Sequence, residues 1–308
     1  NSRIDGFNRY PDPLQIEVKT KLGAMRGVDV DRIFLGVGSD ECIDITYRVF
    51  CRPGIDNVVA IEPTYGMYSV CAAINDVEYR NVRLRDDFSL DVEALFGAVD
   101  GNTKVIWICS PNNPTGNAFP MDVLREVASR FDGIVVVDEA YVDFSDAGSM
   151  VDVLDEYPNL IVMQTFSKAW ASAALRLGIA FASREIISVF NNVKYPYNIN
   201  ILTQRQALSV LESADVIRKV VEELVAARDK LGERLSALEC VRRVHPSDAN
   251  FLLVEVTDAG ALYEFLKSCG VIVRNRSRVA LCGNCLRITV GTDEENDLLI
   301  EKMTEYGN

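Results

Sequence analysis

Short apolar runs that alternate with amphipathic stretches fill the first two thirds of this chain of 308 residues. The runs are rich in β-branched residues and span residues 33–37, 58–61, 77–82, 105–109, 134–137, 160–164 and 177–182. Several are apolar throughout, which indicates strands that are buried on both faces. Helices fit before and between them, over residues 14–26, 40–50, 90–98 and 121–130. Strands that alternate with helices predict an α/β fold with a mostly parallel, helix-covered sheet.

The last third of the chain has a different pattern. Residues 202–238 carry apolar positions at helical spacing among many charges, so we expect a long helical segment, broken at Ser213 or Gly232. Strands are then expected over residues 251–256, 271–273 and 286–290, with helices near 260–268 and from Asp293. This order is typical of a smaller α+β unit. We therefore predict a large domain over residues 9–215 and a small C-terminal domain over residues 216–308.

The charge of the chain narrows the range of its partners. A net charge of −13 and an isoelectric point near 4.7 argue against nucleic acid and anionic membranes. A local basic pocket can still bind a small anion in such a protein. No apolar run approaches ~20 residues, so no transmembrane helix is expected. No signal peptide is visible, and most of the eight cysteines lie in apolar runs, which favours a reduced, cytoplasmic location.

Cys282 and Cys285 have the spacing of a pair of metal ligands. A zinc site would need a second such pair, and the single histidine, His245, is not close in sequence. A Gly-Asn turn between two strands is the favoured interpretation, and no metal site is predicted. His245 is expected in a solvated loop before a strand, which argues against a Ser-His-Asp or Cys-His catalytic site.

The segment Gly-Val-Gly-Ser-Asp-Glu at residues 36–41 follows a predicted strand and opens a predicted helix. Its glycines let the backbone approach a ligand, and the first amides of the helix point at an anion, so we predict a phosphate cradle. A dinucleotide site is the alternative, because Glu62 ends the next strand where a ribose-binding acid is found. That fingerprint needs a third glycine, and Glu41 stands in its place.

Chemically active residues gather at the ends of the predicted strands. Lys168 follows the run 160–164, Asp138 ends a run of valines with Tyr141 close behind, and the turn 112–116 follows another strand. Singly, Asp138 has an ordinary interpretation as a helix cap and residues 112–116 as a loop. Together they provide the amine, carboxylate, phenol and amide that pyridoxal phosphate (PLP) requires.

An anion site accompanies the lysine. Thr165, Ser167 and Arg176 would supply two hydroxyls and a guanidinium for one phosphate, and the planar fork of arginine matches phosphate oxygens. Tyr65, which follows the strand 58–61, is placed to stack on a flat ring, although a packed tyrosine is the simpler interpretation of that residue alone.

Taken together, these segments resemble the class II PLP-dependent aminotransferases of the aspartate-aminotransferase fold. Within that family the chain most resembles the histidinol-phosphate aminotransferases. The similar motifs lie at residues 9–13, 38–41, 63–68, 112–116, 138–141, 167–168, 176 and 286–292, so the resemblance covers nearly the whole chain. The family usually carries an Asn-Glu-Asn-Pro-type segment before the first motif, and residues 1–8 are interpreted as the remnant of that N-terminal arm.

The resemblance implies roles for the residues around the cofactor ring. Lys168 would form the Schiff base with PLP and then shuttle the substrate proton. Asp138 would keep the ring nitrogen protonated. Asn113 and Tyr141 would donate to the phenolate oxygen, and Tyr65 would stack on the ring. Lys168, Asp138 and Tyr141 are thus the expected catalytic residues.

The resemblance also implies how the cofactor phosphate is held. The backbone amides of Ser39 and Asp40, together with Ser167 and Arg176, would bind it. Tyr10 would reach the cofactor phosphate of a neighbouring subunit, so a homodimer is expected.

For the substrates, the resemblance implies transamination between histidinol phosphate and 2-oxoglutarate, with glutamate as the other product, in histidine biosynthesis. Arg287 would bind the α-carboxylate of glutamate, and Arg274 together with Arg287 would face the phosphate of histidinol phosphate. The alternatives are an aromatic or broad-range aminotransferase, a threonine-phosphate decarboxylase of the same fold, and a catalytically silent PLP-fold binding domain.

Overall fold

The computed structural model describes residues 6–307 and contains a seven-stranded sheet in the order β1-β7-β6-β5-β4-β2-β3. The strands are β1 (Ile33–Val37), β2 (Asn57–Glu62), β3 (Glu78–Arg83), β4 (Thr103–Cys109), β5 (Ile134–Asp138), β6 (Leu160–Thr165) and β7 (Leu177–Ala182). β7 runs antiparallel to both β1 and β6, and the other neighbouring pairs are parallel. The predicted mostly parallel sheet is confirmed, with each strand within two residues of its expected bounds.

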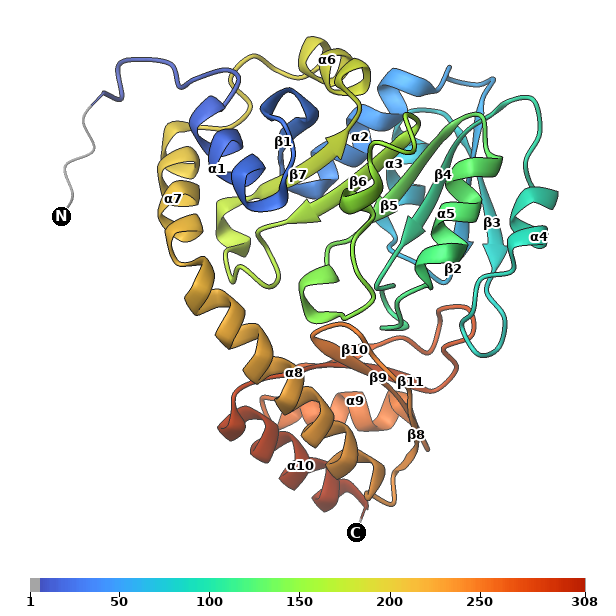
Figure 1. Cartoon of the computed structure of the whole chain (residues 1–308). Coiled ribbons are helices and arrows are strands. Elements are labelled where there is room, and N and C mark those ends of the chain that lie inside the picture. The colour runs from blue at the N-terminus through green and yellow to red at the C-terminus, as the bar shows by residue number, and fades with distance from the viewer. Residues whose placement is uncertain (1–5, 308) are drawn as a thin grey trace.

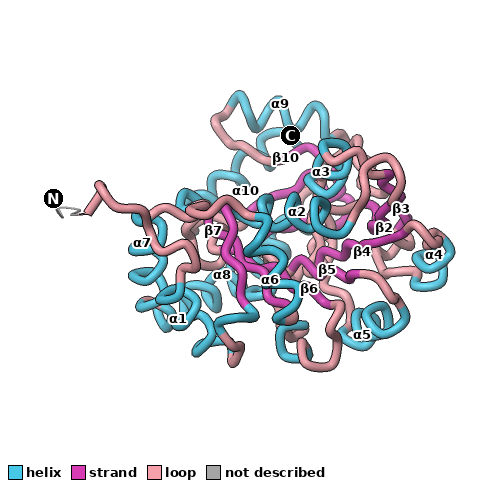
Figure 2. Tube along the Cα trace, turned by 90° about the horizontal axis from the view of Figure 1, so that it is seen from above, coloured by secondary structure: helices cyan, strands magenta, loops and turns pink. Residues whose placement is uncertain are grey.

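Both faces of this sheet are buried, as the apolar runs predicted. In β4, Ile106 and Ile108 face one layer of helices, whereas Trp107 faces the other. The first layer contains α1 (Ile16–Arg26), α4 (Val92–Gly97), α5 (Met121–Arg130) and α7 (Ile201–Glu212). The second contains α2 (Gly38–Phe50), α3 (Met67–Ile74) and α6 (Arg184–Val193). The two views of the chain show this arrangement of a sheet between helices (Figure 1, Figure 2).

A second, antiparallel sheet lies below the first in Figure 1, in the order β10-β11-β9-β8. Its strands are β8 (Val241–Val244), β9 (Phe251–Val256), β10 (Arg274–Asn275) and β11 (Cys285–Thr289), and its helices are α8 (Ala214–Ser236), α9 (Ala259–Ser268) and α10 (Asp293–Gly307). The predicted break at Ser213 is confirmed, whereas Gly232 lies inside α8. The division into domains 9–215 and 216–308 stays a prediction, and it falls at the start of α8.

The strand expected over residues 271–273 is wrong, because these residues join no ladder and only Val273 is buried, whereas Ile272 is 62% exposed. The Val271 N–H donates to the Leu266 carbonyl and so helps to close α9, and Val273 is buried in the core beneath the second sheet. Pairing starts only at Arg274, which lies opposite Arg287 of β11.

The register of the second sheet determines which side chains face the first. Leu252 and Val254 of β9 pack against α8, α9 and α10, whereas Phe251 and Leu253 join the core of the first sheet. Arg287 lies opposite Leu253. Paired residues of antiparallel strands project to the same face, so Arg287 is directed toward the first sheet.

His245 lies in a loop before a strand, as predicted, but the prediction that it is solvated is wrong. Residues 241–244 form β8, which pairs with β9, and the next residue, His245, is only 7% exposed. Its backbone N–H donates to the Leu253 carbonyl at 2.9 Å, and the centroid of its ring lies 5.0 Å from that of the Phe88 ring. Burial lowers the pKa of His245, as it disfavours the charged imidazolium.

The Cys282–Cys285 segment is a turn that leads into β11, as predicted. The Cys285 N–H donates to the Cys282 carbonyl at 3.0 Å, and Asn284 adopts a left-handed conformation with φ of 53°. Both cysteines are buried. Over residues 6–307, no cluster of three or more histidine, cysteine, aspartate or glutamate side chains is arranged to hold a metal ion. None of the helices in that range is long and apolar enough to cross a membrane.

Candidate active site

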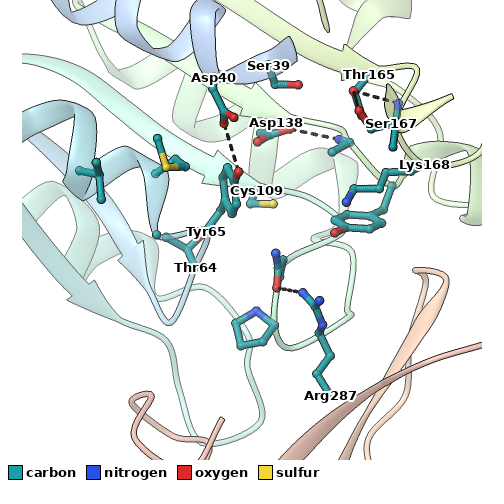
Figure 3. Close-up of a pocket in the computed structure, with 18 of the residues that line it drawn as sticks. Ser39, Asp40, Thr64, Tyr65, Cys109, Asp138, Thr165, Ser167, Lys168 and Arg287 are labelled. Carbon is teal, nitrogen blue, oxygen red and sulfur yellow. Dashed lines mark hydrogen bonds between the residues drawn. The ribbon is translucent and has the colours of Figure 1, made fainter. Parts of the chain in front are cut away.

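A cavity of about 650 Å³ lies between the carboxyl edge of the first sheet and, in the second, the strand β11 with the segment that follows β10. Figure 3 shows Asp138, Lys168 and Tyr65 around this cavity, with Arg287 reaching it from the opposite side. The predicted site residues that line it are Ser39, Asp40, Tyr65, Asn113, Asp138, Tyr141, Thr165, Ser167, Lys168, Arg176 and Arg287. Tyr10, Arg274 and Glu62 are not among its lining residues. The structure therefore brings together residues from positions 39 to 287 at one place.

The topology explains this convergence. β4, β5 and β6 are parallel neighbours, so their last residues, Cys109, Asp138 and Thr165, lie at the same edge. β7 runs in the opposite direction, and its first residue, Leu177, therefore begins at that edge, directly after Arg176. Ligands of open α/β sheets bind at this edge because the loops that follow the strands diverge there.

Asp138 is the buried acid of the cavity. It is 2% exposed, the Tyr68 hydroxyl donates to its Oδ2 at 2.7 Å, and the Ala140 N–H donates to its Oδ1 at 3.1 Å. Burial raises the pKa of Asp138 to about 6, while these two hydrogen bonds and the charge of Lys168 act in the opposite direction. A carboxylate in this position suits a cationic partner in the cavity, such as a protonated ring nitrogen.

Lys168 is the amine of the cavity. Phe166, which is fully buried, anchors the short loop between β6 and the lysine. The Lys168 Nζ lies 5.3 Å from the centroid of the Tyr141 ring. Burial and the nearby charge of Arg287 lower the pKa of Lys168. A lowered pKa increases the fraction of neutral amine, which is the nucleophilic form.

The segment predicted to hold a phosphate opens α2, as expected. Gly38 has a φ of +72°, and a Cβ there would lie 2.5 Å from the Arg176 Nη2. A Cβ on Gly178 would lie 2.3 Å from the Gly38 carbonyl carbon, so β7 packs directly against this backbone. The guanidinium of Arg176, 3.6 Å from the Asp40 carboxylate, therefore lies over the first amides of the helix. Helix amides and a guanidinium together favour an anion.

Hydroxyl groups complete the cradle on the side of β6. The Thr165 hydroxyl donates to the Ser167 Oγ and accepts from the Ser167 N–H, both at 3.1 Å. Ser39, Thr165, Ser167 and Arg176, which the sequence analysis assigned to one phosphate, all line the cavity, and their role there stays a prediction. Glu62 lies outside it, which leaves the dinucleotide alternative without its acid.

The walls of the cavity are held by a second set of hydrogen bonds. The Thr64 hydroxyl donates to the Asn112 Oδ1 at 3.0 Å, and the Asn112 amide donates to the Pro63 carbonyl at 2.9 Å. Asn112 thereby joins the loops that carry Tyr65 and Asn113. The Tyr65 hydroxyl donates to the Asp40 Oδ1 at 3.1 Å, which fixes its ring across the cavity from Lys168.

Two arginines form a cationic corner. The Arg287 Nη1 donates to the Asn113 Oδ1 at 2.8 Å, and its guanidinium lies 5.0 Å from the centroid of the Phe251 ring. Arg276 lines the same cavity. The Nε atoms of both arginines are buried and lack a hydrogen-bond partner. Burial lowers the pKa of Arg287, and the charges of Arg276 and Arg274 add to this effect.

The sequence prediction chose Arg274 for this corner and missed Arg276. Arg274 projects to the same face as Arg287 but is exposed to solvent, whereas Arg276 is half-buried in the cavity wall. Alternation within the segment Arg274-Asn275-Arg276 places both arginines on one face, and this was the available signal. Tyr68 was also missed, because a tyrosine inside an apolar helix has no distinctive pattern.

Tyr10 lies away from the cavity of its own chain. It is 78% exposed, and its ring stacks on that of Tyr197 with a centroid distance of 4.3 Å and an interplanar angle of 11°. The predicted arm, residues 1–8, falls largely on residues 1–5, which lie outside the described residues.

The chemical groups around the cavity are of the types that PLP requires. A primary amine with a lowered pKa, a buried carboxylate, an amide and a phenol surround one space. The cradle that a Cβ at Gly38 or Gly178 would fill suits a phosphate at one end of that space. The arginine corner at the other end suits an anionic substrate.

Comparisons with known proteins agree with this arrangement. The model of the family described as aminotransferase class I and II matches residues 2–303. The histidinol-phosphate aminotransferase of Bacteroides thetaiotaomicron is 52% identical over 97% of this chain and 86% of its own length. The structure of the histidinol-phosphate aminotransferase from Clostridium acetobutylicum has a TM-score of 0.90 at 21% identity and covers 97% of this chain and 91% of that chain. The enzyme of that name from Sinorhizobium meliloti, solved in complex with pyridoxal-5'-phosphate, has a TM-score of 0.88 at 24% identity and covers 96% of this chain and 82% of that chain. These two structures share the fold.

The raised pKa of Asp138 predicts that the cofactor-free protein becomes less stable as the pH rises. Its pKa is about 6 in the folded state against 3.8 ordinarily, so the folded state binds the proton more tightly and loses stability as the pH rises through that window. The asparagine of Asp138→Asn cannot ionise, so the variant avoids a loss of up to about 3 kcal/mol in the free energy of unfolding. We expect the apo variant to be at least as stable as the parent at pH 7, with the advantage gone at pH 4, in urea unfolding.

Burial also raises the pKa of Glu139, to about 7, so both proteins change stability with pH. Glu139 is present in parent and variant, and the difference between them isolates Asp138. A variant that is less stable than the parent at pH 7, with the gap closing at pH 4, would contradict the prediction.

Proposed function

The chain belongs to the aminotransferase class I and II family, and we propose that it uses PLP to transfer an amino group between glutamate and the keto form of histidinol phosphate. The products are histidinol phosphate and 2-oxoglutarate, and this is a step of histidine biosynthesis. The observation that carries the proposal is the cationic corner of Arg276 and Arg287 in the same cavity as Lys168 and Asp138. A dianionic phosphate monoester needs such a corner.

PLP supplies, when bound, the electron sink for the bond that breaks at the amine-bearing carbon. The protein keeps that sink effective through Asp138, whose carboxylate holds a proton on the ring nitrogen. Asn113 and Tyr141 donate hydrogen bonds at the phenolate oxygen. The Asn113 Oδ1 accepts from Arg287, which turns the amide NH₂ away from the arginine and leaves it free to donate.

Lys168 acts as the base and acid of the reaction. Its Nζ would take the proton from the amine-bearing carbon of the substrate and would deliver it to the cofactor. Its lowered pKa matches this task, because a lysine that stayed protonated could not accept a proton. The Tyr141 ring lies beside the Nζ, with the ring centroid 5.3 Å from that atom.

Arg287 binds the anionic end of both substrates. Its position is fixed by Asn113 and by the Phe251 ring, so little side-chain freedom is lost on binding. Glutamate presents a carboxylate to it, and histidinol phosphate, which lacks a carboxylate, presents its phosphate. The second arginine, Arg276, then meets the additional charge of the phosphate, with Arg274 on the same face of the sheet.

Half-reactions test this assignment. Histidinol phosphate and glutamate, added separately, should each change the visible absorbance of the PLP enzyme, whereas phenylalanine should react poorly. Arg276→Ala should weaken the binding of histidinol phosphate by roughly 2–4 kcal/mol, because a charge pair in the cavity is lost. The glutamate half-reaction should change much less. Arg274→Ala should have a smaller effect, and Arg278→Ala, an exposed neighbour outside the cavity, should have none.

Other outcomes would lead to other members of the family. A clear preference for phenylalanine would identify an aromatic aminotransferase. Release of carbon dioxide from threonine phosphate would identify a decarboxylase. Equal losses for both substrates in Arg276→Ala would remove the phosphate-binding role of that arginine.

We further propose a homodimer in which Tyr10 completes the phosphate site of the partner. Tyr10 and Tyr197 form an exposed aromatic pair, and apolar groups gathered at a surface favour association. Two-fold symmetric dimers are the commonest homo-oligomers, and both sites would be completed in the same way.

Mixing two damaged chains tests the shared site. Tyr10→Ala retains Lys168 but lacks the tyrosine it lends, and Lys168→Ala is inactive but retains Tyr10. A mixed dimer contains one intact site, so activity should rise when the two variants are dissociated and reassembled together. Full activity in a sample shown to be monomeric by sedimentation would contradict the proposal.

We also infer a cytoplasmic location. All eight cysteines are free thiols and seven of them are buried, which is typical of a reducing compartment.

A further inference from the structure

Asp138 receives one of its two hydrogen bonds from outside the cavity. Tyr68, in α3, is fully buried and does not line the cavity, yet its hydroxyl donates to the Asp138 Oδ2 at 2.7 Å. The Ala140 N–H donates to Oδ1, so each oxygen accepts one bond from the protein and keeps a lone-pair direction free. The carboxylate is thus held from behind while it faces the cavity.

The position of the Tyr68 hydroxyl is fixed by a stack of aromatic rings. Tyr68 stacks on Trp107 with a centroid distance of 4.9 Å and an interplanar angle of 16°, and Trp107 stacks on Tyr47 at 5.4 Å and 22°. All three side chains are fully buried between the first sheet and the helices α2 and α3. The Tyr47 hydroxyl donates to the Tyr68 carbonyl, not to the carboxylate. Stacked, buried rings have few alternative rotamers, so the donor stays on Asp138.

We propose that Tyr68 is a positioning residue whose hydroxyl orients the Asp138 carboxylate and keeps it ionised, so that the shared proton stays on the cofactor's ring nitrogen. A hydrogen bond to a carboxylate stabilises its charged form, whereas burial favours the protonated form. At Asp138 these two effects oppose each other, and burial is the larger. Without the donor, the proton would shift from the ring toward the carboxyl group, and the ring would withdraw electrons less strongly.

This inference rests on the proposed PLP site but not on the identity of the substrate. The ordinary explanation is that a buried phenol needs some acceptor and that Asp138 happens to provide it. The two explanations differ in what removal of the hydroxyl does to the ring nitrogen, which can be observed without turnover.

Nitrogen NMR of the holoenzyme, loaded with PLP labelled with ¹⁵N in the ring, reports that proton directly. The parent should show a pyridinium signal, and Asp138→Asn should show a neutral one. Tyr68→Phe should move the signal part of the way toward the neutral position. Tyr47→Phe, which removes a hydroxyl from the same stack without touching the carboxylate, should leave it unchanged. A parent-like signal in Tyr68→Phe would overturn the proposal.

A double-mutant cycle on cofactor affinity separates a positioning role from a structural one. Titration of the apoenzymes with PLP should give a dissociation constant roughly ten-fold higher for Tyr68→Phe, as expected for one hydrogen bond to a charged group. In the Asp138→Asn background the same change should have little effect, because the ionised acceptor is gone. If the double variant lost affinity for PLP by the product of the two single losses, Tyr68 would act on packing alone, and the proposal would be refuted.

A second substitution keeps the test open if Tyr68→Phe folds poorly. Tyr68→3,5-difluorotyrosine preserves the ring and makes its hydroxyl a stronger donor, so PLP should bind at least as tightly as in the parent. Weaker binding would contradict the role. If these results hold while histidinol phosphate fails as a substrate, only the substrate assignment is wrong; if the ring nitrogen ignores Tyr68 while histidinol phosphate reacts, only this inference is wrong.

Discussion

The cavity is organised around one carboxylate, Asp138, which is buried at the end of the central strand β5. Burial of an acid is unfavourable unless donors and a cation compensate for the lost water. The fold provides donors through Ala140 and Tyr68, and leaves the cation to the ligand that occupies the cavity. Asp138 thus lowers the folding stability of the empty protein, and a cationic ligand in the cavity would offset that loss. This is typical of positions that are selected for function rather than for stability.

The second requirement is that two sheets meet around the same space. The parallel neighbours β4, β5 and β6 deliver the amide, acid and lysine loops to one edge, because their carboxyl ends coincide. The register of β9 with β11 turns Arg287 toward that edge, and its hydrogen bond to Asn113 ties the two sheets together at the cavity itself. The second sheet and its loops therefore contribute Arg276 and Arg287 to the cavity, and the first sheet contributes Asp138 and Lys168.

Much of this was predictable from the sequence, for physical reasons. Strands buried on both faces leave continuous apolar runs, and the residues after them lie at a known edge. Lys168, Asp138 and Ser39 could therefore be expected to lie close together, as they do in the cavity. The failures involve positions where pairing or packing overrides local pattern. Residues 271–273 look like a strand, but Val271 closes α9 and no ladder forms there, and the loop residue His245 is covered by Phe88. Arg276 had a local signal, its alternation with Arg274, but its burial depends on how β10 pairs with β11. Tyr68 required the packing of α3, which no local pattern specifies.

The most direct test is to trap the cofactor on its lysine. Borohydride reduction of the PLP enzyme, followed by digestion and peptide mass spectrometry, should place the label on Lys168. Lys19 is a stringent internal comparison, because it is 2% exposed and burial lowers its pKa to about 8, yet it lies outside the cavity. A lowered pKa alone would therefore label both residues, whereas the geometry described above predicts Lys168 only. A label on Lys19 or any other lysine, with Lys168 unmodified, would contradict the account.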